Sequence, residues 1–255
     1  MKRLPAARKR RVNGAVLYHG PSQLDGEEIV VVLTGLARGG SKNSKTGKML
    51  QTWILRADRD PRQASLTGAD ASICGDCKHR RNNGGACYVV IEQAPLAVWR
   101  AWKRGIYADW TKAFPANALK GRRVRLGSYG DPAAVPYNVW RRVLDQKITG
   151  WTGYTHQWKR SDFKRLRSVV MASVDTAEEA DEARADVWRT FRVRASGEEL
   201  RRGEVSCPAS DEMGKLTTCE KCGLCQGLQS EAKDIAIQAH GYIAGRFEKT
   251  VAAKG

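Results

Sequence analysis

The chain has 255 residues, and its 44 Lys and Arg against 27 Asp and Glu give a formal net charge of +17. With 42% hydrophobic and 28% charged residues it can bury a core, which excludes the disordered and fibrous classes. No apolar run reaches the ~20 residues of a membrane helix, and the basic N-terminus leads into polar sequence instead of a signal-peptide segment. We therefore expect a cytoplasmic protein of one large domain that makes no membrane contact.

The N-terminal region is predicted to form a basic arm and then a β-hairpin. Residues 1–13 are rich in Lys and Arg without an apolar period, which is typical of a flexible arm that either contacts phosphates or is solvated. Glu28–Leu36 and Met49–Arg56 are rich in β-branched and aromatic residues and predict two strands. The Gly, Ser, Lys and Asn residues of 38–48 predict a long basic hairpin tip. We assign 14–65 to this hairpin subdomain.

From about residue 66 to residue 245, short strand-like runs alternate with helical stretches. Strands are predicted at Arg123–Gly127, Gly150–His156, Ser168–Val174, Thr190–Val193, Gly203–Cys207 and Asp234–His240. Helices are predicted at Tyr137–Gln146, Ser161–Leu166 and Ala177–Trp188. Thr176 is a candidate N-cap for the last of these. The alternation predicts an α/β fold with parallel strands, arranged as a partial (β/α) barrel, and we assign 246–255 to a C-terminal tail.

The first cysteine group comprises Cys74, Cys77 and Cys87, with two and then nine residues between neighbours. In a cytoplasmic chain, clustered cysteines favour a metal or redox site over disulfides. Three thiolates leave one position of a metal site unfilled. His79 could complete a tetrahedral zinc site, or a cubane iron–sulfur cluster could keep one iron open to another ligand.

The second group comprises Cys207, Cys219, Cys222 and Cys225, with eleven, two and two residues between neighbours. Four thiolates complete a coordination sphere, so the pattern predicts a closed site for zinc or for a [4Fe–4S] cluster. Zinc sites more often use two separated Cys pairs. Because three cysteines lie within seven residues here, we favour iron and sulfur.

Several polar residues fall at or just after the ends of predicted strands. Parallel strands carry functional residues at their carboxyl ends, so these side chains are predicted to converge on one face. They are Asp131, His156, Ser173, Asp175 and Cys207. Each also has an ordinary interpretation as a turn, a cap or a buried polar residue. Asp131, His156 and Asp175 are our candidate catalytic residues.

Four features together resemble the radical S-adenosylmethionine (SAM) superfamily. The first is the triad Cys74, Cys77 and Cys87, although the family's usual triad has three and then two intervening residues. The second is the segment 127–132 (GSYGDP), which is similar to the family's Gly-Gly-Glu-Pro turn, with Asp131 in place of Glu. The third is Ser173-Val174-Asp175 before a helix, and the fourth is the C-terminal cysteine group, which resembles an auxiliary cluster. The chain also resembles an uncharacterised phage-associated family with paired Cys groups.

This resemblance implies a cofactor and a chemistry. Members of the superfamily bind a [4Fe–4S] cluster through three cysteines, and S-adenosylmethionine chelates the open iron. They form a 5′-deoxyadenosyl radical that abstracts a hydrogen atom from the substrate. The resemblance implies that S-adenosylmethionine contacts Gly127, Ser128, Gly130, Asp131 and Ser173.

Two functions remain open at this point. The first is an iron–sulfur enzyme of the radical SAM type, with one or two clusters. Its positive charge favours a nucleotide or a nucleic acid as substrate. The second is a non-enzymatic nucleic-acid-binding protein, in which two zinc sites hold the fold and basic segments bind phosphates.

Overall fold

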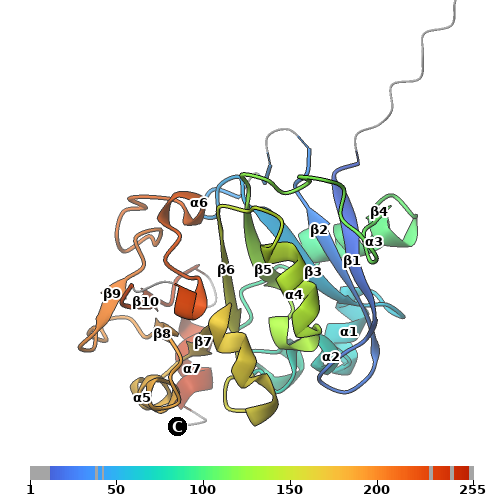
Figure 1. The fold of residues 1–255 in the computed structure, drawn as a ribbon. Coiled ribbons are helices and arrows are strands. Elements are labelled where there is room, and N and C mark those ends of the chain that lie inside the picture. The colour runs from blue at the N-terminus through green and yellow to red at the C-terminus, as the bar shows by residue number, and fades with distance from the viewer. Residues whose placement is uncertain (1–11, 38–39, 42, 230–231, 242–243, 253–255) are drawn as a thin grey trace, which may run out of the picture.

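A computed structural model describes residues 12–37, 40–41, 43–229, 232–241 and 244–252. The described strands form one ten-stranded sheet in the order β4-β1-β2-β3-β5-β6-β7-β8-β10-β9. In Figure 1 the N-terminal strands stand on one side of the molecule and the C-terminal strands on the other. The order is linear, so the sheet has two edges and is open. The prediction of an α/β fold with parallel strands is confirmed, but a barrel is not clearly formed.

The N-terminal strands form an antiparallel unit that continues into the rest of the sheet. They are β1 (Gly14–Pro21), β2 (Glu28–Thr34) and β3 (Leu50–Arg56). Strand β2 is buried along most of its length because it lies between β1 and β3. The short β4 (Ala108–Asp109) pairs with β1 at one edge. The predicted hairpin is therefore part of a larger sheet, joined to it through β3.

From β3 onward all strand pairs are parallel. The strands are β5 (Arg123–Tyr129), β6 (Gly150–Thr155), β7 (Met171–Val174), β8 (Thr190–Arg194), β9 (Glu204–Ser206) and β10 (Asp234–Gln238). Each coincides with a predicted strand to within a few residues. Parallel strands bring their carboxyl ends to one edge of a sheet, which is the usual position of a binding site.

Helices connect the strands and cover the sheet. The α-helices are α1 (Pro61–Thr67), α2 (Ala71–Cys74), α3 (Ala94–Lys103), α4 (Tyr137–Leu144), α5 (Ala177–Ala185), α6 (Cys219–Cys222) and α7 (Ala244–Ala252). The 3-10 helices are η1 (Arg81–Asn83), η2 (Pro132–Ala134), η3 (Ser161–Ser168) and η4 (Gly227–Gln229). Helix α4 crosses in front of the central strands in Figure 1. None of the helices in the described ranges is long and apolar enough to cross a membrane.

Three predicted helices correspond to α4, η3 and α5. The predicted cap of α5 is confirmed, because the Thr176 hydroxyl accepts a hydrogen bond of 3.1 Å from the amide of Glu179. Segment Ser161–Ser168 forms a 3-10 helix. At the C-terminus, where a tail was predicted, residues 246–252 belong to α7. The basic arm lies outside the described residues, except for its last two positions.

Two hydrophobic clusters form the core. The larger extends from β1 to the end of α5 and includes Trp140, whose indole N–H donates to the carbonyl of Pro132 at 2.9 Å. The smaller lies beneath β8, β9 and β10 and contains two cysteines among its six buried residues: Met171, Cys207, Ala209, Cys225, Ile235 and Ile237. The C-terminal part of the sheet is therefore held by a much smaller apolar core.

Candidate active site

A cavity of about 400 Å³ lies along one face of the parallel strands and reaches their carboxyl ends. Strands β5, β6, β7, β8 and β10 all contribute side chains to its wall. All seven cysteines of the chain also line it: Cys74, Cys77, Cys87, Cys207, Cys219, Cys222 and Cys225. Both cysteine groups therefore open on the same space.

The first cysteine group lies on a loop that begins where α2 ends at Cys74. Gly75 follows with φ of 61°, and a Cβ there would lie 2.5 Å from atoms of the Gln157 amide. That amide donates hydrogen bonds to the carbonyl of Cys74 (3.3 Å) and to the carboxylate of Asp76 (2.7 Å). The guanidinium of Arg80 donates to the carbonyl of Gly75 at 3.1 Å. The loop is thus fixed against the end of β6.

The three thiols of this loop are buried neighbours. Burial raises the pKa of Cys77 to about 12 and that of Cys87 to about 11. Burial raises the pKa of Cys74 still further above its ordinary value, with an added contribution from the neighbouring Cys77 and Cys87. A bound metal cation would lower the pKa values of these three thiols, because it favours the thiolate form.

The second cysteine group packs against the loop between β2 and β3. The amide of Cys219 donates to the carbonyl of Lys45 at 2.9 Å. One residue further on, the carboxylate of Glu220 accepts a hydrogen bond of 2.8 Å from the amide of Lys48. The described part of the predicted hairpin tip is therefore attached to α6, and Lys45 lines the cavity.

Cys225 is one of two buried cysteines of the second group, together with Cys207. Burial raises the pKa of Cys225 to about 12, although the Tyr154 hydroxyl donates a hydrogen bond to it and acts in the opposite direction. Burial also raises the pKa of Cys207 and of Cys219. The positive charge of Lys45 partly opposes this rise at both thiols, and the positive charge of Arg125 opposes it more strongly at Cys219. The second group is thus a set of neighbouring thiols, two buried and two half-buried, beside Lys45 and Arg125.

The surroundings of the sulfur atoms suit a metal that binds thiolates. Cys77, Cys87 and Cys207 each accept a hydrogen bond from the backbone N–H two residues further along the chain. Such amide–sulfur bonds orient thiolate ligands and tune iron–sulfur clusters. Within the residues that the structure describes, no three His, Cys, Asp or Glu side chains are grouped around the position of a single metal ion. The case for iron–sulfur or zinc at these two groups therefore rests on the chemistry of the thiolate donors and not on a preformed geometry.

The predicted cofactor turn, residues 127–132, begins within the carboxyl end of β5 and also lines the cavity. Gly127 and Gly130 have φ of 69° and 82°, a conformation that favours glycine. A Cβ at Gly127 would lie 2.6 Å from the carbonyl oxygen of Gly130, so the turn needs glycine there. The Ser128 hydroxyl donates to the side-chain oxygen of Gln51 at 2.6 Å. The turn presents backbone at the cavity wall.

Asp131 is buried at the end of this turn and holds it to β6. Its carboxylate accepts hydrogen bonds from the amide of Ala133 (2.9 Å), the hydroxyl of Thr155 (2.7 Å) and the amide of His156 (2.7 Å). Burial raises the pKa of Asp131, and the nearby His156 and these bonds act against it. Asp131 and His156 both line the cavity, as predicted strand-end residues should, and the contacts of Asp131 position the turn.

Asp175 joins the strand end of β7 to the first cysteine loop. Its Oδ2 lies 2.7 Å from Nε2 of His79 and 3.0 Å from Nζ of Lys78. Burial acts to raise the pKa of Asp175, but the hydrogen bond and charge of His79 outweigh it and hold that pKa at about 2. Ser173, two residues earlier, also lines the cavity. His79, a candidate zinc ligand, thus has one ring nitrogen committed to Asp175.

Four further cavity residues were not predicted as site residues: Lys45, Arg125, Tyr154 and Phe247. Phe247 of α7 stacks on His79, with ring centroids 5.5 Å apart. Arg125 could have been found from the alternation of β5, because it is two positions before Gly127 and therefore on the same face. The contribution of α7 depends on long-range packing and leaves no local signal.

Comparison of the chain with protein-family models, with curated proteins and with solved structures finds no match. The fold and the site define an α/β protein whose parallel sheet carries a cavity lined by two groups of cysteines.

Proposed function

We propose that the chain is an iron–sulfur enzyme of the radical SAM type that acts on a nucleotide or a nucleic acid. The observation that carries the proposal is that both cysteine groups line one cavity, the first beside the carboxyl ends of β5 and β6 and the second beside the amino-terminal parts of the same two strands. Structural metal sites need only be closed and buried, whereas a shared cavity provides space for a substrate between two metal groups.

The two groups support different roles. Cys74, Cys77 and Cys87 provide three thiolates, which leaves one iron of a cubane open to another ligand. Cys207 with the three cysteines of 219–225 provides four, which closes a second cluster. When bound, the first cluster together with S-adenosylmethionine supplies hydrogen-atom abstraction. The protein supplies binding, orientation and exclusion of water.

The chain's own residues support the binding of a cofactor beside the first group. The glycines 127 and 130 let a ligand approach the backbone closely, and Ser128 and Ser173 offer hydroxyls on the same wall. Asp131 holds this turn against the end of β6 by two hydrogen bonds, from the hydroxyl of Thr155 and the amide of His156. The contact of His79 with Asp175 fixes the cysteine loop to β7. A rigid wall of this kind keeps reacting groups in position.

The substrate class rests on charge. The net charge of +17 attracts polyanions, and the described loop between β2 and β3 brings Lys45 to the cavity wall. A non-enzymatic protein with two structural zinc sites would share the charge, but it would have no use for a cavity between the sites.

The test is cleavage of S-adenosylmethionine by protein purified without oxygen and reduced with dithionite. We expect 5′-deoxyadenosine and methionine as products, measured by chromatography. Cys77→Ala should abolish them, while Arg141→Gln, a change on the outer helix α4, should leave the yield unchanged. The absence of cleavage by protein that carries a full complement of iron would overturn the proposal.

A further inference from the structure

Arg125 has an unusual position in the cavity wall. It lies on β5, between the turn that follows that strand and the second cysteine group, and it lines the cavity. Its guanidinium donates one hydrogen bond, of 2.6 Å, to the hydroxyl of Tyr88. Its Nε is buried and has no hydrogen-bond partner among the described residues. Arg125 is therefore a cation on the cavity side of the sheet, and its Nε–H has no acceptor among the described residues.

Several other arginines, among them Arg123 and Arg189, also keep one buried nitrogen without a hydrogen-bond partner in the described part of the chain, but most interior arginines have strong partners elsewhere. Arg56, Arg80 and Arg192 each form ion pairs with buried or partly buried carboxylates. Arg189 instead donates to three backbone carbonyls. For Arg125 no carboxylate lies within ion-pair distance in the described ranges. Arg125 is half-buried, and its buried, unpaired Nε–H favours an anion as partner, so we look for that anion outside the chain.

The neighbours of Arg125 include a second cation and an apolar wall. Lys45 lines the same cavity and forms no ion pair with any residue that the structure describes. On β6 and β8, the rings of Tyr154 and Phe191 lie 4.5 Å apart and are tilted by 48°. Val193 and Ile237 extend this apolar surface. A ligand that fits the cavity thus has an anionic group at one end and an aromatic or apolar body at the other.

We propose that Arg125, aided by Lys45, is an anion-binding subsite for the phosphate or carboxylate of a small aromatic ligand, whose body lies against Tyr154 and Phe191. Guanidinium groups bind both kinds of anion through paired N–H donors. As a statement about the substrate of this cavity, the proposal rests on the proposed function. Binding of the anion itself can be measured without any turnover.

The test is titration calorimetry on the complete protein, purified without oxygen, in buffer free of phosphate and sulfate. The probes are phenyl phosphate and benzoate, with phenol as the neutral counterpart. We expect at least one of the two anions to bind more tightly than phenol, and the preference between them identifies the anionic group.

Variants locate the subsite. Arg125→Gln should weaken binding of the preferred anion roughly ten- to a hundredfold, the usual effect of losing a charged hydrogen bond in a buried site. Arg125→Lys should have an intermediate effect, because it keeps the charge and loses the forked donor. Arg141→Gln removes an exposed arginine from α4 and should leave binding unchanged. Lys45→Gln should weaken it less than Arg125→Gln, and this variant provides a reading if Arg125→Gln does not fold.

The outcomes separate this proposal from the proposed function. If wild type binds neither anion more tightly than phenol, the proposal is wrong. If anion binding survives Arg125→Gln, the proposal is equally wrong, and Arg125 and Lys45 balance the charge of the thiolates instead. If Arg125→Gln does not fold, anion binding that survives Lys45→Gln leads to the same conclusion. Either result leaves cleavage of S-adenosylmethionine unaffected. Conversely, anion binding that depends on Arg125 in a protein without iron would support this subsite and overturn the proposed function.

Discussion

The two sides of the sheet are stabilised by different means. From β1 to α5, apolar side chains such as Leu126 and Trp140 form one large buried cluster. From β8 to β10, the apolar cluster is small, and polar contacts replace it. Arg192 and Glu204 form a fully buried ion pair at 2.7 Å, and Arg184 bonds to Asp234 at 2.7 Å.

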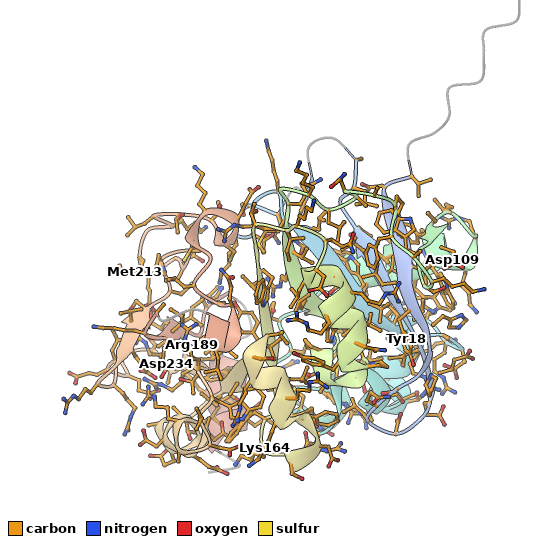
Figure 2. The ribbon with its side chains drawn as sticks, viewed as in Figure 1. Tyr18, Asp109, Lys164, Arg189, Met213 and Asp234 are labelled. Carbon is orange, nitrogen blue, oxygen red and sulfur yellow. The ribbon has the colours of Figure 1, made fainter. Side chains whose placement is uncertain are left out.

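Figure 2 shows the two regions together. Arg189 and Asp234 lie in the C-terminal region, while Tyr18 and Asp109 lie at the opposite, N-terminal side. The amide of Thr190 and the guanidinium of Arg184 both donate to Asp234. If the four thiols hold a metal group as proposed, this region, with its few apolar contacts, depends on that group for its stability. The comparison therefore predicts that metal loss affects the C-terminal region first.

The largest effect is expected from Cys222→Ala. Loss of one ligand from a closed site removes metal binding that is coupled to folding. We expect a loss of roughly 4 kcal/mol or more, which lowers the melting temperature by about 10 °C. Cys77→Ala, the control in the first group, should abolish S-adenosylmethionine cleavage and lower the melting temperature much less. Thermal melts that show the opposite order would reverse the roles of the two groups.

Arg192→Met tests the buried ion pair. The variant leaves the buried Glu204 carboxylate with only Arg184, at 3.6 Å, as a charged partner among the described residues, so we expect a cost of up to about 3–5 kcal/mol. The double variant Arg192→Met with Glu204→Leu removes both charges and should recover most of that loss, as measured by urea denaturation. A double variant no more stable than Arg192→Met alone would mean that the pair contributes by packing.

Leu126→Ala tests the apolar region. Leu126 is fully buried on β5, so its truncation should cost about 2–5 kcal/mol. Because none of the buried residues of the large cluster is a cysteine, although Cys74 packs against it, the loss should be nearly the same for metal-loaded and metal-depleted protein. A loss that differs between the two forms would show that the two regions unfold together.

The smallest effect is expected from Glu220→Gln. The bond from the Lys48 amide to Glu220 is exposed, so its loss should cost about 1 kcal/mol or less. This bond joins the loop between β2 and β3 to the second cysteine group. Hydrogen exchange of residues 43–48 should therefore rise in the variant, while Glu178→Gln, on an exposed position of α5, should leave it unchanged.

Most of the sheet could be predicted from the sequence. Strands such as β2 and β3 are runs of β-branched and aromatic residues, and α5 begins at a capping Thr176. Strand β1 was missed because Gly14, His19 and Pro21 interrupt its apolar pattern. Helix α7 was missed because it follows the last predicted strand without a clear start signal.

The site could be predicted only in part. The cysteine spacing identified both groups, and the strand-end rule identified Asp131, His156 and Asp175 as cavity residues. That both groups line one cavity depends on how β6 to β10 pack, which spacing does not contain. The partner of His79 and the isolation of Arg125 likewise depend on contacts between distant segments.

The central claim is that the two cysteine groups hold iron–sulfur clusters on one cavity. The most direct test is the iron and zinc content of protein purified without oxygen, together with its visible spectrum. We predict brown protein that approaches roughly eight irons per chain after reconstitution, four for each cubane. Stoichiometric zinc at both groups, with no visible absorbance, would contradict the account.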